Sequence, residues 1–160
     1  MNEAAESGPE RVQRLLREAG LAAEVVRLAS SARTAAEAAA AIGCTVEQIA
    51  KSIVFRGAHS GAHILVIASG GNRVDESRVA AAIGEPLVKA DAAFVRERTG
   101  YAIGGVAPIG HALAPRHVLI DADLAKLDPI WAAAGHPHTV FPLTYADLLR
   151  LTSGTVTQIA

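Results

Sequence analysis

The spacing of apolar positions changes along this chain between a helical and a strand period, and these changes mark the predicted elements. Near the N-terminus, Val12 and Leu16 recur at helical spacing between Pro9, in the first turn, and Gly20, at the end. Residues 51–55 and 63–68 are instead rich in β-forming residues and are separated by a loop of glycine, histidine and serine. The pattern therefore predicts an N-terminal helix followed later by an antiparallel pair of strands.

Capping residues predict the remaining helices. Thr34, with Glu37 three positions later, forms a capping-box pattern at the start of an alanine-rich helix that ends at Gly43. Asp75, Asp91 and Thr144 are expected to cap three further helices. We expect a short helical turn at residues 46–50 and additional strands at 23–28, 87–89, 117–121 and 138–143. Short antiparallel strands mixed with helices predict an α+β fold whose mixed, mainly antiparallel sheet is surrounded by helices.

The length and charge of the chain restrict its organisation and its partners. A chain of 160 residues is expected to form a single domain over residues 1–160. The net charge of −1 excludes a protein that holds nucleic acid by bulk charge alone, but leaves room for a weak or partner-assisted contact. Residues 51–120 hold eight basic and five acidic side chains, a local charge of +3. This segment is where we expect an anionic ligand to bind.

The cysteine content and the apolar runs favour a soluble, cytoplasmic protein. Cys44 is the single cysteine, so neither an internal disulfide nor a multi-cysteine zinc site is available. The acidic first ten residues do not resemble a secretory signal. The longest apolar runs are far shorter than the roughly 18 residues that a membrane-spanning helix needs.

Lys51 is unusual because, at a period of two, it shares a strand face with Ile53 and Phe55. One interpretation is a strand-end lysine whose aliphatic stem covers apolar surface while its ammonium reaches water. The other is a cation at the edge of a pocket, placed for a phosphate or a developing negative charge. The pattern alone leaves both open.

Residues 100–115 contain four glycines and two prolines among apolar residues, which indicates an irregular loop or a tight hairpin. The stretch lacks the Gly-Lys-Ser/Thr ending of a P-loop, and Pro108 stands where a dinucleotide-binding fingerprint would begin its helix. The adjacent Gly104 and Gly105 serve either a hairpin with positive φ or a backbone that a ligand can approach closely.

His136 and His138 stand two positions apart around Pro137, so an extended chain would point them the same way. No third ligand accompanies them at a recognisable spacing, and a loop that lines a pocket is favoured over a zinc site. No Gly-x-Ser-x-Gly motif is present, and Cys44 is expected to be a small buried residue. The sequence therefore offers no support for covalent catalysis.

Several of these segments together resemble one known family. The segments are Gln48 to Phe55, the apolar strand Ile64 to Ala68, Asn72 to Asp75 and Thr99 to Gly110. In this order they resemble the YbaK-type aminoacyl-tRNA editing domains, which include the insertion domain of bacterial prolyl-tRNA synthetases and its free-standing relatives. The resemblance extends from about Ala22 to Leu151.

The resemblance implies a YbaK-like fold and a trans-editing deacylase. Such a protein hydrolyses the ester between a wrong amino acid and the 3′-terminal adenosine of tRNA, without a metal, a cofactor or a protein nucleophile. It also implies catalytic roles for Lys51 and for Gly104, which leads the glycine-x-x-x-proline loop, and substrate binding by Gly105, Pro108 and either His138 or His136. The implied partners are the 3′ acceptor end of aminoacyl-tRNA and prolyl-tRNA synthetase.

The resemblance suggests tRNA(Pro) carrying alanine, cysteine or serine as substrate, although one methylene or hydroxyl discriminates by only about 1 to 3 kcal/mol. Two alternatives remain. One is a non-catalytic module that binds aminoacyl-tRNA or a synthetase through the same pocket. The other is a small-molecule esterase without a tRNA substrate.

Overall fold

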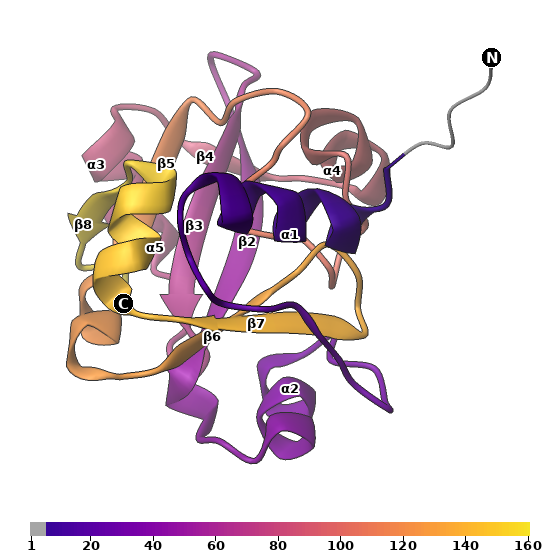
Figure 1. Ribbon diagram of the computed structural model, residues 1–160. Helices are drawn as coiled ribbons and strands as arrows, with labels where there is room; N and C mark the ends of the chain where they lie inside the picture. The colour runs from indigo at the N-terminus through magenta and orange to yellow at the C-terminus, as the bar shows by residue number, and fades with distance from the viewer. Residues whose placement is uncertain (1–5) are drawn as a thin grey trace, which may run out of the picture.

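The computed structural model describes residues 6–160. Its strands form one mixed sheet, and its helices lie around that sheet (Figure 1). The sheet has the strand order β1-β7-β6-β2-β3-β5-β8, and β4 pairs with β2 beside this path. The helices are α1 (Gly8–Glu18), α2 (Ala35–Ile42), α3 (Glu76–Ile83), α4 (Ala92–Thr99) and α5 (Tyr145–Thr152). The strands are β1 (Val26–Arg27), β2 (Ile49–Gly57), β3 (His63–Ser69), β4 (Leu87–Lys89), β5 (His117–Asp121), β6 (Ile130–Ala133), β7 (Thr139–Leu143) and β8 (Thr155–Thr157). The predicted α+β architecture is confirmed.

The central hairpin of β2 and β3 follows the sequence pattern closely. Its register pairs Ala50 with Ser69 and Arg56 with His63. Every residue of β3 is buried, because helices cover both faces of the sheet. α1 and α5 lie together over one face in Figure 1. There Leu16 and Leu148 pack in one core with Leu65.

The opposite face of β3 packs against α3, where Val79 joins a second core with Ile64 and Val66. Because directly paired residues of an antiparallel ladder share a face, the register assigns Lys51, Ile53 and Phe55 to the α3 side. Ser52 and Val54 lie on the α1/α5 side for the same reason. The two faces of β2 therefore belong to two different cores.

Helix starts agree with the capping prediction. The side chains of Thr34, Asp75, Asp91 and Thr144 each accept a hydrogen bond from a backbone N–H in the first turn of their helix. The strand predicted at 23–28 is reduced to Val26–Arg27, because β7 provides backbone partners for only these two positions. No helix within residues 6–160 has the length and apolar character that crossing a membrane requires.

Candidate active site

The sheet is interrupted at one edge of β2. The edge opposite β3 pairs with β6 at Ile49 and Ala50, and with β4 from Phe55 onward. Between these two pairings, residues 51–54 have a strand partner only on the β3 side. A four-residue opening therefore lies inside the sheet rather than at its rim.

Ser52 directs its backbone toward this opening. Gly70 N–H donates to Ile49 C=O and Gly57 N–H donates to Ala62 C=O, so the odd-numbered residues of β2 turn their backbone groups toward β3. Backbone groups alternate along an antiparallel strand, and the N–H and C=O of Ser52 consequently face the opening. Its Oγ is also buried and has no hydrogen-bond partner within residues 6–160. Unpaired buried polar groups are costly unless a ligand or water meets them.

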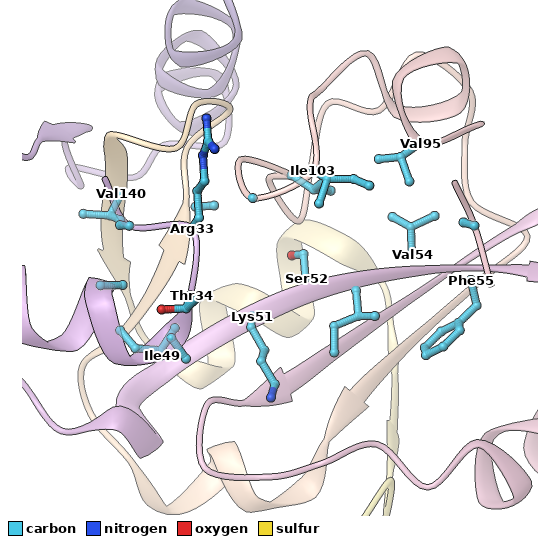
Figure 2. A pocket seen from close by; sticks show the side chains of 18 of the residues that line it. Arg33, Thr34, Ile49, Lys51, Ser52, Val54, Phe55, Val95, Ile103 and Val140 are labelled. Carbon is cyan, nitrogen blue, oxygen red and sulfur yellow. The ribbon is translucent and has the colours of Figure 1, made fainter. Parts of the chain in front are cut away.

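A cavity of about 480 Å³ occupies the opening. Its lining includes residues whose side chains lie on both faces of β2. In Figure 2, Ser52 and Val54 point toward Arg33, Val95 and Ile103, whereas Lys51 and Phe55 point to the opposite side. Most lining side chains are apolar, including Ile49, Ile53, Val54, Val95, Val106, Trp131 and Val140; the charged ones are Arg33, Lys51, Glu76 and Lys89. An apolar cavity with a few converging polar groups is the usual form of a small-ligand site.

Lys51 and Gly104, the two predicted catalytic residues, both line this cavity. Gly104 lies against Arg33, whereas the Lys51 side chain points to the other side of β2 in Figure 2. The Lys51 ammonium donates a hydrogen bond of 2.7 Å to the carbonyl of Asn72. Burial lowers the pKa of Lys51, and the nearby carboxylate of Asp121 opposes that shift. Lys51 is therefore a partly buried strand lysine that borders the cavity, and a role for its ammonium in binding or catalysis stays a prediction.

Gly104 and Gly105 bring the loop into close contact with two neighbouring segments. Gly104 has φ +88, and a Cβ there would lie 2.9 Å from Cγ of Arg33. Gly105 is buried, and a Cβ would lie 2.8 Å from the carbonyl carbon of His136. Both positions therefore need glycine for different reasons, a left-handed backbone at Gly104 and close packing at Gly105.

Side chains hold the rest of the loop by its carbonyl oxygens. The Tyr101 hydroxyl donates to Ile109 C=O at 2.8 Å, and the Arg11 guanidinium donates to Gly110 C=O at 3.0 Å. His111 Nε2 lies 2.8 Å from Ala107 C=O, an atom that can only accept, so Nε2 carries the proton. The loop is thereby fixed by three long-range or buried side chains instead of a strand ladder.

His63 extends this arrangement into the sheet. Its Nε2 lies 3.2 Å from His111 Nδ1, and with the proton of His111 on Nε2, Nδ1 accepts from His63. Only 2% of His63 is exposed. Burial, with smaller contributions from His111 and Arg98, lowers the pKa of His63 to about 4. Burial also lowers the pKa of His111, so both imidazoles are neutral at pH 7.

The other predicted site residues lie around the cavity and not in its lining. Pro108 is buried and lines a second cavity of about 560 Å³ between the loop, α1 and α5. His136 is exposed, and its imidazole centroid lies 5.5 Å from that of His138. Within residues 6–160, no three His, Cys, Asp or Glu side chains gather as metal ligands. Sequence reasoning missed Ser52 and Arg33. The opening and the approach of Arg33 to Gly104 both depend on long-range contacts, which no pattern of neighbouring residues in the sequence indicates.

A family model described as "Aminoacyl-tRNA editing domain" matches residues 29–151. The chain belongs to this family of editing domains. An uncharacterised protein of Bacillus subtilis, YwhH, is 32% identical over 125 residues, which is 78% of each chain. A solved structure described as a candidate trans-editing enzyme for prolyl tRNA synthetase is 41% identical, with a TM-score of 0.89 and 98% of each chain covered.

A third similarity bears on the fold and not on the function. The hypothetical protein APE2540 is 24% identical, with a TM-score of 0.84, and the match covers 93% of this chain and 98% of that one. The matched residues 29–151 include β2, the opening and the glycine loop. The cavity therefore lies wholly within the part of the chain that defines the family.

Proposed function

We propose that this editing domain hydrolyses the ester bond of a mischarged tRNA in trans, with tRNA(Pro) carrying a small wrong amino acid as its substrate. The observation that carries the proposal is the opening in β2, where Ser52, whose buried Oγ has no hydrogen-bond partner within residues 6–160, lines an apolar cavity together with Gly104 of the glycine loop. An aminoacyl ester is already activated, so a site that binds it and orients water supplies much of the required rate.

In the proposed step, the aminoacyl end enters the cavity with its carbonyl between β2 and the loop. A water oxygen adds to the ester carbonyl, the carbonyl carbon then releases the ribose 3′ oxygen, and a proton from the water ends on that oxygen. The 2′-hydroxyl of the substrate assists the attack. Backbone groups of the Gly104 loop hold the aminoacyl end, and the Lys51 ammonium contributes positive charge as negative charge develops in the cavity.

The first test measures deacylation of a panel of mischarged tRNAs by the purified protein, with and without a chelator. We expect hydrolysis of at least one tRNA(Pro) that carries alanine, cysteine or serine, and the same rate with chelator. Binding to every charged tRNA without hydrolysis would favour the non-catalytic module. Equal hydrolysis of simple amino acid esters would favour the esterase.

The second test uses substitutions in the cavity. Lys51→Ala is expected to lower the deacylation rate at least a hundredfold, since it removes the charge without opening a large buried hole. Gly104→Ala is expected to impair turnover as well, because a Cβ at φ +88 is strained and meets Arg33. The matched control is Lys126→Ala, at an exposed lysine whose Nζ lies 3.9 Å from a carboxylate oxygen of Asp123. A Lys51→Ala rate near that of the control would remove Lys51 from the site.

A further inference from the structure

A cluster of cationic and imidazole side chains lies beside the glycine loop, and we name Arg27, Arg33, His136 and His138 the mouth cluster. Two antiparallel segments carry it. Arg27 is in register with Thr139, and Leu28 N–H donates to His138 C=O at 2.7 Å. After an irregular stretch, Ala32 N–H donates to Pro137 C=O at 2.6 Å, which brings the residue before Arg33 beside the same segment. The backbone thus fixes all four side chains on neighbouring positions.

The charges of the cluster act on one another. The pKa of His136 is lowered by partial burial, then by the charges of Arg27, His138 and Arg33. Within residues 6–160 neither arginine forms an ion pair with a carboxylate. Like charges gathered without an acidic partner repel each other, and an anion bound among them would remove that cost.

The cluster also borders the cavity. Arg33 is part of the cavity lining and stands against Gly104, while the backbone of His136 stands against Gly105. In Figure 2, Arg33 rises from the side of the cavity that holds Ser52 and Ile103. A ligand in the cavity would therefore meet the positive charge of Arg33 on the side where Gly104 lies.

We propose that the mouth cluster binds the phosphate on the 5′ side of the terminal adenosine of the RNA. This proposal rests on the proposed function, which places the aminoacyl adenosine in the cavity. The phosphate is then the first charged group that leads away from the cavity. Guanidinium groups match phosphate oxygens with two parallel hydrogen bonds, and the two imidazoles add donors when protonated.

A single phosphate can be tested with two small substrates, 3′-aminoacyl adenosine with and without a 5′-phosphate. We expect the wild-type protein to hydrolyse the phosphorylated compound about tenfold faster at subsaturating concentration, since one charge-assisted contact supplies that factor. In Arg27→Gln/Arg33→Gln the ratio should fall close to one. Arg17→Gln/Lys126→Gln, at two exposed residues away from the mouth cluster, also removes two positive charges and should keep the tenfold ratio.

Binding of uncharged RNA separates this proposal from the proposed function. A short RNA hairpin ending in CCA is titrated against each protein at several salt concentrations, which requires no hydrolysis. For Arg27→Gln/Arg33→Gln, we expect weaker binding and a salt slope smaller by roughly 0.7, the contribution of one phosphate contact on a single strand. Equal binding by Arg27→Gln/Arg33→Gln and Arg17→Gln/Lys126→Gln would overturn the mouth cluster. If the wild-type protein hydrolyses no ester but shows this difference, the proposed function fails and the phosphate site stands.

Discussion

The two walls of the cavity are held by different kinds of bonds. The β2 wall is a regular strand that β3 pairs over seven consecutive positions. The loop wall, residues 100–111, is held at three carbonyls by the side chains of Tyr101, His111 and Arg11. Backbone ladders tolerate most substitutions, whereas a side-chain anchor is lost with one residue. Single substitutions should therefore displace the loop wall far more readily than the strand wall.

The largest effect is expected from Gly105→Ala. The new Cβ would lie 2.8 to 3.0 Å from backbone atoms of His136, which cannot move as a side chain could, so the loop must shift away from the opening. We expect deacylation to fall at least a hundredfold and the free energy of unfolding to fall by about 1–3 kcal/mol. The control is Gly71→Ala, where a Cβ would meet only the flexible side chain of Glu47. Similar rates for both variants would show that the loop position does not matter.

Substitution of His111 tests the anchoring of the loop directly. His111→Leu leaves the carbonyl of Ala107 without its donor, and we expect a tenfold to hundredfold loss of deacylation. His111→Gln retains an amide donor and should recover most of that loss. Denaturant unfolding of both variants accompanies the kinetics. If Leu and Gln lower the rate equally, hydrogen bonding by His111 does not position the loop.

The buried imidazoles make stability depend on pH. The unfolded chain binds a proton at His63 near pH 6.5, but the folded chain takes it up only at about pH 4. The free energy of unfolding is therefore unaffected by this group above pH 6.5 and falls by about 1.4 kcal/mol per pH unit between 6.5 and 4. Denaturant unfolding at pH 7, 5.5 and 4.5 measures the slope.

A His63→Gln variant provides the comparison for that slope. The free energy of unfolding of the variant should depend on pH less steeply, by the contribution of about one proton, or about 1.4 kcal/mol per pH unit. Glu85 also contributes to the pH dependence. Backbone and side-chain hydrogen bonds from Ser60, with a backbone hydrogen bond from His59, lower the pKa of Glu85 to about 2. Protonation of Glu85 therefore lowers the free energy of unfolding further only below about pH 4.5. The interval above pH 4.5 therefore isolates the imidazoles. An unchanged slope in His63→Gln would contradict a neutral buried His63.

The smallest effect on folding is expected on the strand wall. Ser52→Ala removes an Oγ that has no partner within residues 6–160, so the free energy of unfolding should change by less than about 0.5 kcal/mol. A severalfold rise in KM for the mischarged tRNA is expected if the hydroxyl binds substrate. A Ser52→Ala protein with wild-type KM would leave only the backbone of Ser52 in the site.

Local signals in the sequence predicted much of the fold. The β-forming composition of 51–55 and 63–68 and the caps at Thr34, Asp75, Asp91 and Thr144 each reflect interactions within a few residues, and all are confirmed. Ser7 and Glu10 form a capping box whose S-x-x-E spacing could also have been recognised. β6, with the sequence Ile-Trp-Ala-Ala, has no alternating pattern and becomes a strand through pairing with β2 and β7.

The candidate site was predictable only in part, for the same reason. Lys51 stood out because it breaks an apolar face, and Gly104 and Gly105 because of their loop composition. The opening depends instead on where β6 and β4 meet β2, a matter of long-range register that no local pattern contains. The mouth cluster likewise combines residues more than a hundred positions apart. They come from residues 1–50 and 121–160, and neither of these two parts of the chain has a net positive charge.

The opening in β2 has a consequence for how such a protein can diversify. Every residue except proline supplies the same peptide N–H and C=O, so replacing Ser52 leaves both groups at the opening in place. Substitutions at lining positions such as Val54, Val95 or Ile103 would instead alter the shape of the cavity. If the proposed function holds, selection or engineering could therefore change which amino acid the cavity accepts while the backbone groups at the opening are inherited without alteration.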